Sequence, residues 1–466
     1  MQSPDNKLGT TVQPHLGVWD VAAITAGIII GSGIYRSPPD IAKLVNGPSA
    51  LLGLWVVGGI IAMVGALCYA ELAAAYPQQG GTYVYLNRAF GRWCGFLYAW
   101  CEFWIVRPGN VGAMAFIFVD YAGAFVPELD SPLRKVTVAC AVVFALGSIN
   151  LLGVRVGKRT QLALSLAKVL GLLLIFAVGM WRPGVSDWGP AVPIAIGSIS
   201  LDRWLLAMVF VLFAYGGWNE TAAVTAEVRD PQRNMLRGLL LGTAIVIGVY
   251  LLANLAFLRS LGFDGVAQSE AVAADLMSGA LGYAGRLVIS ASVCISCLGA
   301  INGMLFTGSR LYYALGVEHR TFGWLGHWNE RLGTPVRALV LQTAISIALI
   351  IIFGLSSNAF ELLVLFTVPV FWSFLLLVSI AVVVLRVSDG KTPRPFRLPL
   401  FPLEPAIFFT ASLLMIYSGV NYLLTKERAL SFQVSAGWML LVLVSGLLVY
   451  FLSRDQAPAG SAEDKV

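Results

Sequence analysis

Charged residues are scarce in this chain. Of its 466 residues only 12% are Asp, Glu, Lys or Arg, whereas 58% are hydrophobic. A water-soluble globular domain is roughly a quarter charged. The composition therefore excludes a soluble fold of this size, and no stretch of the sequence is polar enough to form a separate soluble domain.

Histidine and cysteine are also few, with three and six residues respectively. His15, His319 and His327 fall in expected termini or loops, and neither an HExxH nor a GxSxG motif occurs, which argues against an enzyme. All cysteines lie inside apolar runs, where they behave as small hydrophobic residues. We expect no disulfide framework, no metal site and no cofactor.

Apolar runs of about 20 residues recur along the chain, and each is long enough to cross a hydrocarbon layer of about 30 Å as a helix. The runs do not alternate with polar residues, so they indicate helices and not a barrel. The first sixteen residues are polar and do not resemble a signal peptide, so the first run is a retained span. The expected spans are 18–36, 50–76, 95–125, 136–152, 160–181, 202–226, 236–258, 286–314, 337–355, 359–386, 403–424 and 432–453.

Twelve spans place both termini on one side of the membrane. The loops on that side carry more Lys and Arg than the loops opposite, which indicates cytoplasmic termini in a cell membrane, either a plasma membrane or a bacterial inner membrane. The sequence divides into a cytoplasmic N-terminus, two sets of five spans, two further spans and a polar tail expected to be disordered. These segments are 1–17, 18–181, 202–386, 403–453 and 454–466.

Two spans contain glycines that weaken a helix at its middle. The first span carries Gly27, Gly31 and Gly33 around Ser32, and the sixth carries Gly216-Gly217 at a comparable depth. Each interior glycine costs a helix about 1 kcal/mol relative to alanine. A single pair is most simply a close-packing device. Breaks in corresponding spans of two halves instead predict the central site of a transporter.

A broken helix suits an amino acid because it frees backbone groups of both polarities. N–H groups at the start of the outer half-helix can hold a carboxylate, and C=O groups at the end of the inner half-helix can hold an ammonium. We expect the carboxylate at the N–H groups of Ser32 and Gly33. The ammonium is expected at carbonyls of Ile28, Ile29, Phe213 and Ala214.

Five motifs resemble the L-type amino acid transporter branch of the amino acid, polyamine and organocation superfamily, in a bacterial type without a heavy chain. They are GSGIY, YAELAAAYPQQGGTYVYL, IVRP, FAYGGWN and TPRPFRLPLFP, in chain order. The resemblance implies an all-α fold of twelve transmembrane helices. The first ten helices would form two inverted repeats of five, in which the first and sixth helices are discontinuous, and two additional helices would follow. The resemblance also implies transport by alternating access.

The resemblance also implies roles for individual residues. Its glycine motif corresponds to Gly31, Ser32 and Gly33, and its aromatic gate to Phe213, which would close over the substrate. Trp218 and Asn219 correspond to family residues that form part of the pocket wall and give it polar support, respectively.

Two departures from the family pattern matter. Members that carry cystine and dibasic amino acids tend to have Asp where this chain has Gly216, so a neutral substrate is favoured over a cationic amino acid or polyamine. Animal members join a glycoprotein through a cysteine in the loop after the third span. The segment 125–135 has no cysteine, so we expect no disulfide-linked heavy chain, and we expect a monomer.

Lys168 is an ionisable residue deep in the fifth span, where insertion costs at least about 2.5 to 3.5 kcal/mol. It resembles the lysine of sodium-independent members, whose ammonium takes the place of a bound sodium ion by bonding carbonyls of the first break. A locally paired lysine that only packs is the alternative. A buried lysine could also exchange protons, which would make the protein a proton symporter.

Further charges lie within the expected spans or at their ends. Glu102 and Arg107 are five residues apart and should not share a helix face well, so we expect each to pair with a neighbouring helix. Glu220 follows Trp218-Asn219 and is a possible pocket residue, proton site or helix cap. Glu71, Glu227 and Arg310 lie near helix ends, where we expect solvated interfacial charges and a gate network is the alternative.

The main hypothesis is a sodium-independent exchanger of neutral L-amino acids. The alternatives are a proton-coupled symporter, a transporter of cationic amino acids or polyamines, and a membrane receptor that binds an amino acid without moving it. We expect no appended signalling domain, which argues against a receptor. Measuring flux separates a receptor from a transporter.

Overall fold

The computed structural model describes residues 14–126, 129, 131–181, 200–269, 271–354, 359–425 and 429–453. Within these residues the chain is almost wholly helical. Its extended pairings are two isolated bridges, Leu16 with Val228 and Asn329 with Thr334. Most of the expected N-terminal segment and the whole expected tail lie outside the described residues, so the expected disorder of the tail stays a prediction.

The helices follow one another with short connections. In the first half of the chain they are α1 Val18–Ile29, α2 Gly33–Ala42, α3 Pro48–Ala75, α4 Thr82–Phe90, α5 Arg92–Cys101, the π-helix η1 Glu102–Val106, α6 Arg107–Ala122, α7 Pro132–Leu151 and α8 Val154–Trp181. In the second half they are α9 Leu201–Ala214, the 3-10 helix η3 Trp218–Glu227, α10 Pro231–Gln268, α11 Val272–Glu318, the 3-10 helix η4 Arg320–Leu325, α12 Val336–Gly354, α13 Ala359–Ser388, α14 Leu403–Thr425 and α15 Ala429–Ser453.

Many of these helices are long and apolar enough to cross a membrane. Among the described residues seven pass this test, or eight if α1 and α2 are taken as one bent span. The prediction of an all-helical polytopic membrane protein is thereby confirmed. Each of the twelve expected ranges overlaps a helical segment, but the number of crossings and the inverted repeat stay predictions.

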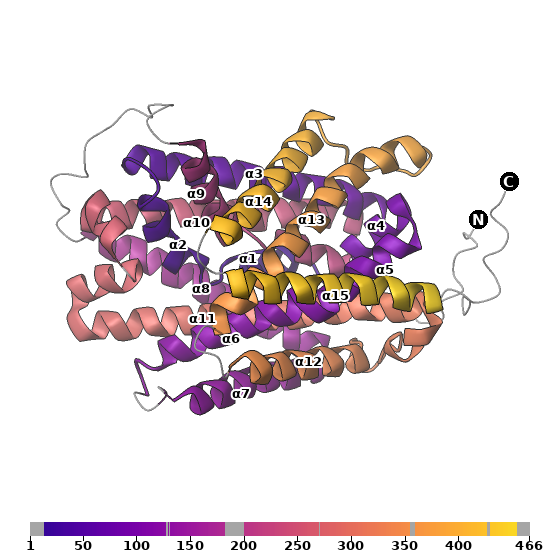
Figure 1. Cartoon of the computed structure of the whole chain (residues 1–466), viewed down its shortest axis with the longest axis horizontal. Coiled ribbons are helices and arrows are strands. Elements are labelled where there is room, and N and C mark those ends of the chain that lie inside the picture. Colours follow the sequence, from indigo (N-terminus) through magenta and orange to yellow (C-terminus); the bar gives the residue numbers. More distant parts are fainter. Residues whose placement is uncertain are drawn as a thin grey trace.

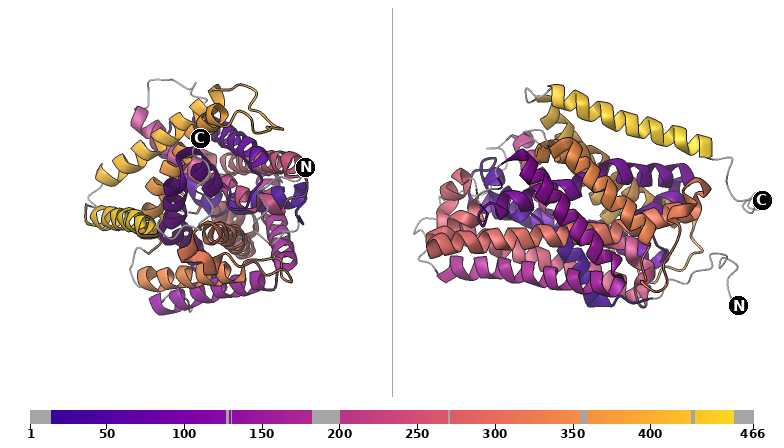
Figure 2. Two further views of the ribbon diagram at one scale, coloured as in Figure 1. Left: turned by 90° about the vertical axis from the view of Figure 1, so that its right-hand side faces the viewer. Right: turned by 90° about the horizontal axis from the view of Figure 1, so that it is seen from below.

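The helices run largely along the long axis of the molecule (Figure 1). Helices α7 and α12 lie side by side at one edge, and α15 lies along the outside of the bundle (Figure 2). Helix α1 lies in the interior and contacts α8, α10 and α11. The first expected break is therefore surrounded by protein, the condition under which non-helical backbone is tolerated at membrane depth.

Helix α8 illustrates how the sequence orients a helix in this bundle. Ser165, Lys168 and Leu172 are buried at helical spacing, whereas Leu166 and Leu170 on the other face are 57% and 56% exposed. An apolar face that is left exposed suits contact with lipid, so the helix turns its polar residues toward its neighbours. This rotation directs Lys168 to α1.

Candidate functional site

The first break separates α1 from α2. Helix α1 ends at Ile29, α2 begins at Gly33, and the two are bent by 49° relative to each other. Glycine is required at position 33 because a Cβ there would lie 2.8 Å from the Cα and 2.9 Å from the Cβ of Ala214. The two interrupted helices can touch only because this side chain is absent.

The second break follows Ala214, the last residue of α9. Gly217 has a φ of 113°, a left-handed conformation that favours glycine. A Cβ at this glycine would also lie 2.8 Å from Cγ2 of Ile28. The chain then continues as the 3-10 helix Trp218–Glu227 instead of an α-helix. Both sequence-predicted breaks are thus places where the helix stops and the backbones of two segments approach closely.

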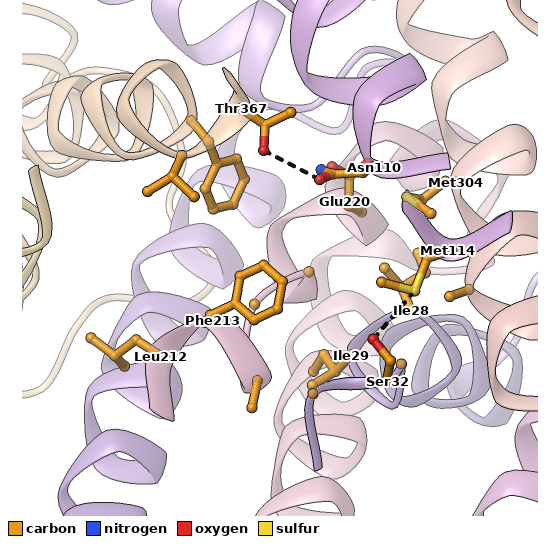
Figure 3. Close-up of a pocket in the computed structure, with 18 of the residues that line it drawn as sticks. Ile28, Ile29, Ser32, Asn110, Met114, Leu212, Phe213, Glu220, Met304 and Thr367 are labelled. Carbon is orange, nitrogen blue, oxygen red and sulfur yellow. Dashed lines mark hydrogen bonds between the residues drawn. The ribbon is translucent and has the colours of Figure 1, made fainter. Parts of the chain in front are cut away.

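A cavity of about 110 Å³ lies between the two breaks. Of the sequence-predicted residues, those that line it are Ile28, Ile29, Gly31, Ser32, Gly33, Phe213, Ala214, Gly216 and Glu220. The ring of Phe213 points into it (Figure 3). Leu212 of α9 and Gly217 also line it. The remaining wall comes from α6, α11 and α13, through Asn110, Met114, Ala300, Met304, Thr367, Val368, Phe371 and Trp372.

The backbone at the first break has unused donors and acceptors. The N–H of Ser32 donates to no acceptor among the described residues, although Ser32 is only 5% exposed. The carbonyl of Ile28 consequently lacks the partner that it would have in a continuous helix. The positive end of α2 and the carbonyl end of α1 therefore both face the cavity, as a zwitterion requires.

Tyr250 of α10 was missed by sequence reasoning. Its hydroxyl lies 3.1 Å from the carbonyl oxygen of Ile29 and 3.2 Å from that of Ala214, so it bridges the ends of α1 and α9. Its ring packs against Trp55 and Tyr215. A tyrosine inside an apolar span must find a partner for its hydroxyl, but the sequence does not say which one.

Lys168 lies beside the cavity and contacts the first break from behind. Its Nζ donates to the carbonyl oxygens of Gly27, at 2.5 Å, and Ile30, at 2.6 Å. The hydroxyl of Ser296 also donates to the Ile30 carbonyl, at 3.2 Å. Gly299 makes room for the lysine, because a Cβ there would lie 2.8 Å from Nζ. The ammonium thus satisfies carbonyls that the break sets free.

Glu102, Arg107 and Glu220 form a buried ion-pair cluster. The expectation that Glu102 and Arg107 do not share a helix face is wrong, because Glu102–Val106 is a π-helix, in which residues five apart are neighbours. Arg107 Nη2 lies 3.3 Å from Glu102 Oε2 and 2.5 Å from Glu220 Oε2. Arg107 also donates to the Met304 carbonyl, at 3.1 Å.

Trp218 and Asn219 do not line the cavity between the breaks. They line a smaller void, of about 10 Å³, which shares Gly216 and Gly217 with the cavity. The Trp218 ring packs edge-on against Tyr69, with centroids 5.1 Å apart. The structure therefore places these two residues next to the second break and outside the lining of the cavity.

Two further ion-pair networks tie helix ends together. Arg310 pairs with Glu227 at 2.7 Å, and both side chains are 1% exposed. The backbone carbonyl of Glu227 also accepts the N–H of Leu16, at 2.9 Å. In the second network Glu71 pairs with Arg386 and Arg394. These carboxylates are buried and fully engaged, so the expectation of solvated interfacial charges is wrong for them.

The site thus presents the N–H end of α2 and the carbonyl end of α1 to one small cavity. The sequence pattern described as "Amino acid permease" matches residues 16–448, nearly the whole chain. This chain belongs to the amino acid permease family. Membership confirms the resemblance stated above and the predicted transport of amino acids.

Named relatives of this permease extend over nearly its full length. It is 32% identical to the human large neutral amino acids transporter small subunit 2, over 95% of this chain and 81% of the relative. It is 30% identical to the mouse b(0,+)-type amino acid transporter 1, over 95% and 88%. It is 27% identical to the serine/threonine exchanger SteT of Bacillus subtilis, over 97% and 98%.

Proposed function

We propose that this permease is a sodium-independent exchanger of neutral L-amino acids. It would work by alternating access through twelve spans arranged as two inverted repeats of five, with two added helices. The proposal that transport is independent of sodium rests on one observation. Lys168 Nζ contacts the carbonyls of Gly27 and Ile30, at 2.5 and 2.6 Å. A fixed ammonium at these carbonyls supplies the positive charge that a sodium ion would otherwise bring.

The substrate lies between the two breaks in this proposal. Its carboxylate accepts from the N–H groups of Ser32 and Gly33 at the start of α2. Its ammonium binds the carbonyl ends of α1 and α9, and its side chain lies against Phe213. The unpartnered N–H of Ser32 and the position of both breaks at one cavity support this orientation.

A neutral substrate is supported by the sequence at the second break. Gly216 stands where family members for dibasic amino acids tend to carry Asp, and Glu220 is the one ionisable residue among those described that line the cavity. Glu220 is already paired with Arg107. One named relative is a transporter of large neutral amino acids and another is a serine/threonine exchanger.

The orientation and assembly belong to the same proposal. Both termini lie in the cytoplasm, on the side richer in loop Lys and Arg. The protein works as a monomer without a disulfide-linked heavy chain, as the lack of cysteine in the segment 125–135 suggests.

Counterflow in proteoliposomes tests the proposal. Purified protein is reconstituted in sodium-free buffer with unlabelled amino acid inside and a trace of labelled amino acid outside. We expect uptake only when the lumen contains amino acid, with no response to added sodium or to a pH gradient. Uptake driven by a pH gradient would identify a proton symporter, and binding without uptake would identify a receptor.

The variant Lys168→Met adds a direct check on the coupling site. It leaves the carbonyls of Gly27 and Ile30 without the two charge-assisted hydrogen bonds, each worth about 1.5 to 3 kcal/mol. We expect at least a tenfold loss of exchange. Exchange equal to that of the unmodified protein would contradict the role given to Lys168.

A further inference from the structure

The cavity has a polar end opposite the first break. Figure 3 shows Ser32 on one side of the cavity and Glu220, Asn110 and Thr367 gathered on the other. The Thr367 hydroxyl lies 3.5 Å from Oδ1 of Asn110. A substrate whose charged ends are held at the break therefore extends its side chain toward this polar end.

Glu220 offers an open acceptor there. Its Oε2 is held by Arg107 at 2.5 Å and lies 3.3 Å from the Thr307 hydroxyl. Its Oε1 has no hydrogen-bond partner among the described residues and is not sealed off from the cavity that Glu220 lines. A carboxylate oxygen that lacks a donor within the protein can accept a hydrogen bond from a ligand in the cavity.

The position of Glu220 is fixed by surrounding elements. It lies in the first turn of the 3-10 helix, and Arg107 reaches it from the π-helical junction of η1 and α6. Arg107 is itself anchored to the Met304 carbonyl and the Thr307 hydroxyl of α11, both at 3.1 Å. A hydrogen-bonding group held by packed neighbours can discriminate between substrates, because it cannot turn away from a wrong one.

From these observations we propose that Glu220, positioned by Arg107, is the side-chain selectivity residue. It selects neutral amino acids whose side chain ends in a hydroxyl or amide donor. The inference rests on the proposed transport of neutral amino acids and adds the chemical class of the side chain.

Two pairs of nearly isosteric substrates test it. Threonine and valine differ by a hydroxyl in place of a methyl group, and asparagine and leucine by an amide in place of an isopropyl group. In proteoliposome exchange we expect the half-saturating concentration to be lower for threonine than for valine, and lower for asparagine than for leucine. The difference should be roughly tenfold or more, the size expected for a hydrogen bond to a charged group.

Variants test whether Glu220 causes the preference for threonine over valine. In Glu220→Leu the threonine-to-valine ratio should fall to about one, because threonine is weakened while valine is kept. Glu220→Gln retains an acceptor of the same shape and should keep part of the preference, so the proposal can be judged even if the leucine variant does not fold. Glu102→Gln alters the same cluster without lining the cavity and should leave the ratio unchanged.

The possible results separate this inference from the proposed function. Equal exchange of threonine and valine by the unmodified protein overturns the selectivity role and leaves amino acid exchange standing. A preference for lysine, or an unchanged ratio in both Glu220 variants, also overturns it. Failure to exchange any of the twenty amino acids overturns the proposed function together with this inference.

Discussion

Tyr250→Phe removes a single oxygen atom that connects the two interrupted helices. The hydroxyl bridges the carbonyls of Ile29 and Ala214, at 3.1 and 3.2 Å. Both carbonyls belong to the segment ends that we propose as the ammonium site. The phenylalanine ring keeps the contacts with Trp55 and Tyr215, whose centroids lie 5.6 and 5.2 Å away. The substitution therefore changes hydrogen bonding with little change in packing.

The magnitude follows from the Ala214 carbonyl, because the Ile29 carbonyl still accepts the N–H of Gly31, at 2.7 Å. Leaving a buried acceptor unsatisfied costs about 1 to 3 kcal/mol. Without the hydroxyl the two segment ends are free to rearrange toward other donors, and only the fraction of molecules with both ends in place binds substrate at full strength. Apparent affinity falls in proportion to that fraction. We therefore expect the dissociation constant for the best substrate to rise by about 5-fold to 150-fold.

Tyr215→Phe is the matched control. The Tyr215 hydroxyl belongs to the same aromatic cluster but donates to the carbonyl of Trp55, at 3.2 Å, and not to either break. Affinity is measured by the concentration of amino acid that half-saturates a thermal shift of the purified protein. If the two variants bind with the same affinity as each other, the bridging role of Tyr250 is refuted.

Three further predictions concern packing, an ion pair and pH. Gly33→Ala should abolish exchange because its Cβ would lie 2.8 Å from Cα of Ala214, whereas Gly248→Ala, whose Cβ meets nothing within 4 Å, should leave exchange intact. Glu227→Gln should lower the free energy of unfolding by up to about 3 to 5 kcal/mol because Arg310 is left buried without a charged partner. Thermal inactivation measures this, and a stability like that of the unmodified protein would contradict it. His319 follows the end of α11, and burial, aided by Arg92, lowers its pKa to about 4. Because the unfolded imidazole has a pKa of about 6.5, stability should be lost as the pH falls from about 6.5 to about 4, and His319→Phe should abolish this loss when inactivation is compared at pH 5 and pH 8.

The helical segments were predictable because their signal is local. A run of apolar residues long enough to cross a membrane is written in consecutive positions, and each expected range overlaps a helix. The two breaks were predictable for the same reason, since Gly31-Ser32-Gly33 and Gly216-Gly217 are visible without knowing what surrounds them. The direction that each residue faces after a break was not predictable.

Trp218 and Asn219 illustrate this limit. The left-handed conformation of Gly217 turns the chain, and the next segment has the tighter winding of a 3-10 helix. The roles of pocket wall and polar support came from the family resemblance, and a motif does not specify how the chain winds after the break. Glu220, three residues beyond Gly217, is the one that returns to the cavity.

The partners of Lys168 and Arg107 depend on contacts across the fold. Lys168 stood out because a charge in an apolar span needs a partner, and its relation to the first break came from the family resemblance. Arg107 was misread because the spacing to Glu102 was judged by α-helical geometry. A π-turn leaves no clear mark in the sequence, yet it lets one guanidinium join Glu102 to Glu220.

Backbone groups and side chains have different roles in the proposed site. In the proposed mechanism the two breaks hold groups that all amino acids share. Gly33 and Gly217 are set by backbone geometry and admit almost no other residue, because a Cβ would lie 2.8 Å from Ala214 and from Ile28, respectively. Side-chain selectivity falls to the far end of the cavity, where Glu220 can be replaced without changing a backbone contact. Substitutions at the breaks should therefore reduce exchange of every substrate together, whereas substitutions of Glu220 should change only which substrate is preferred.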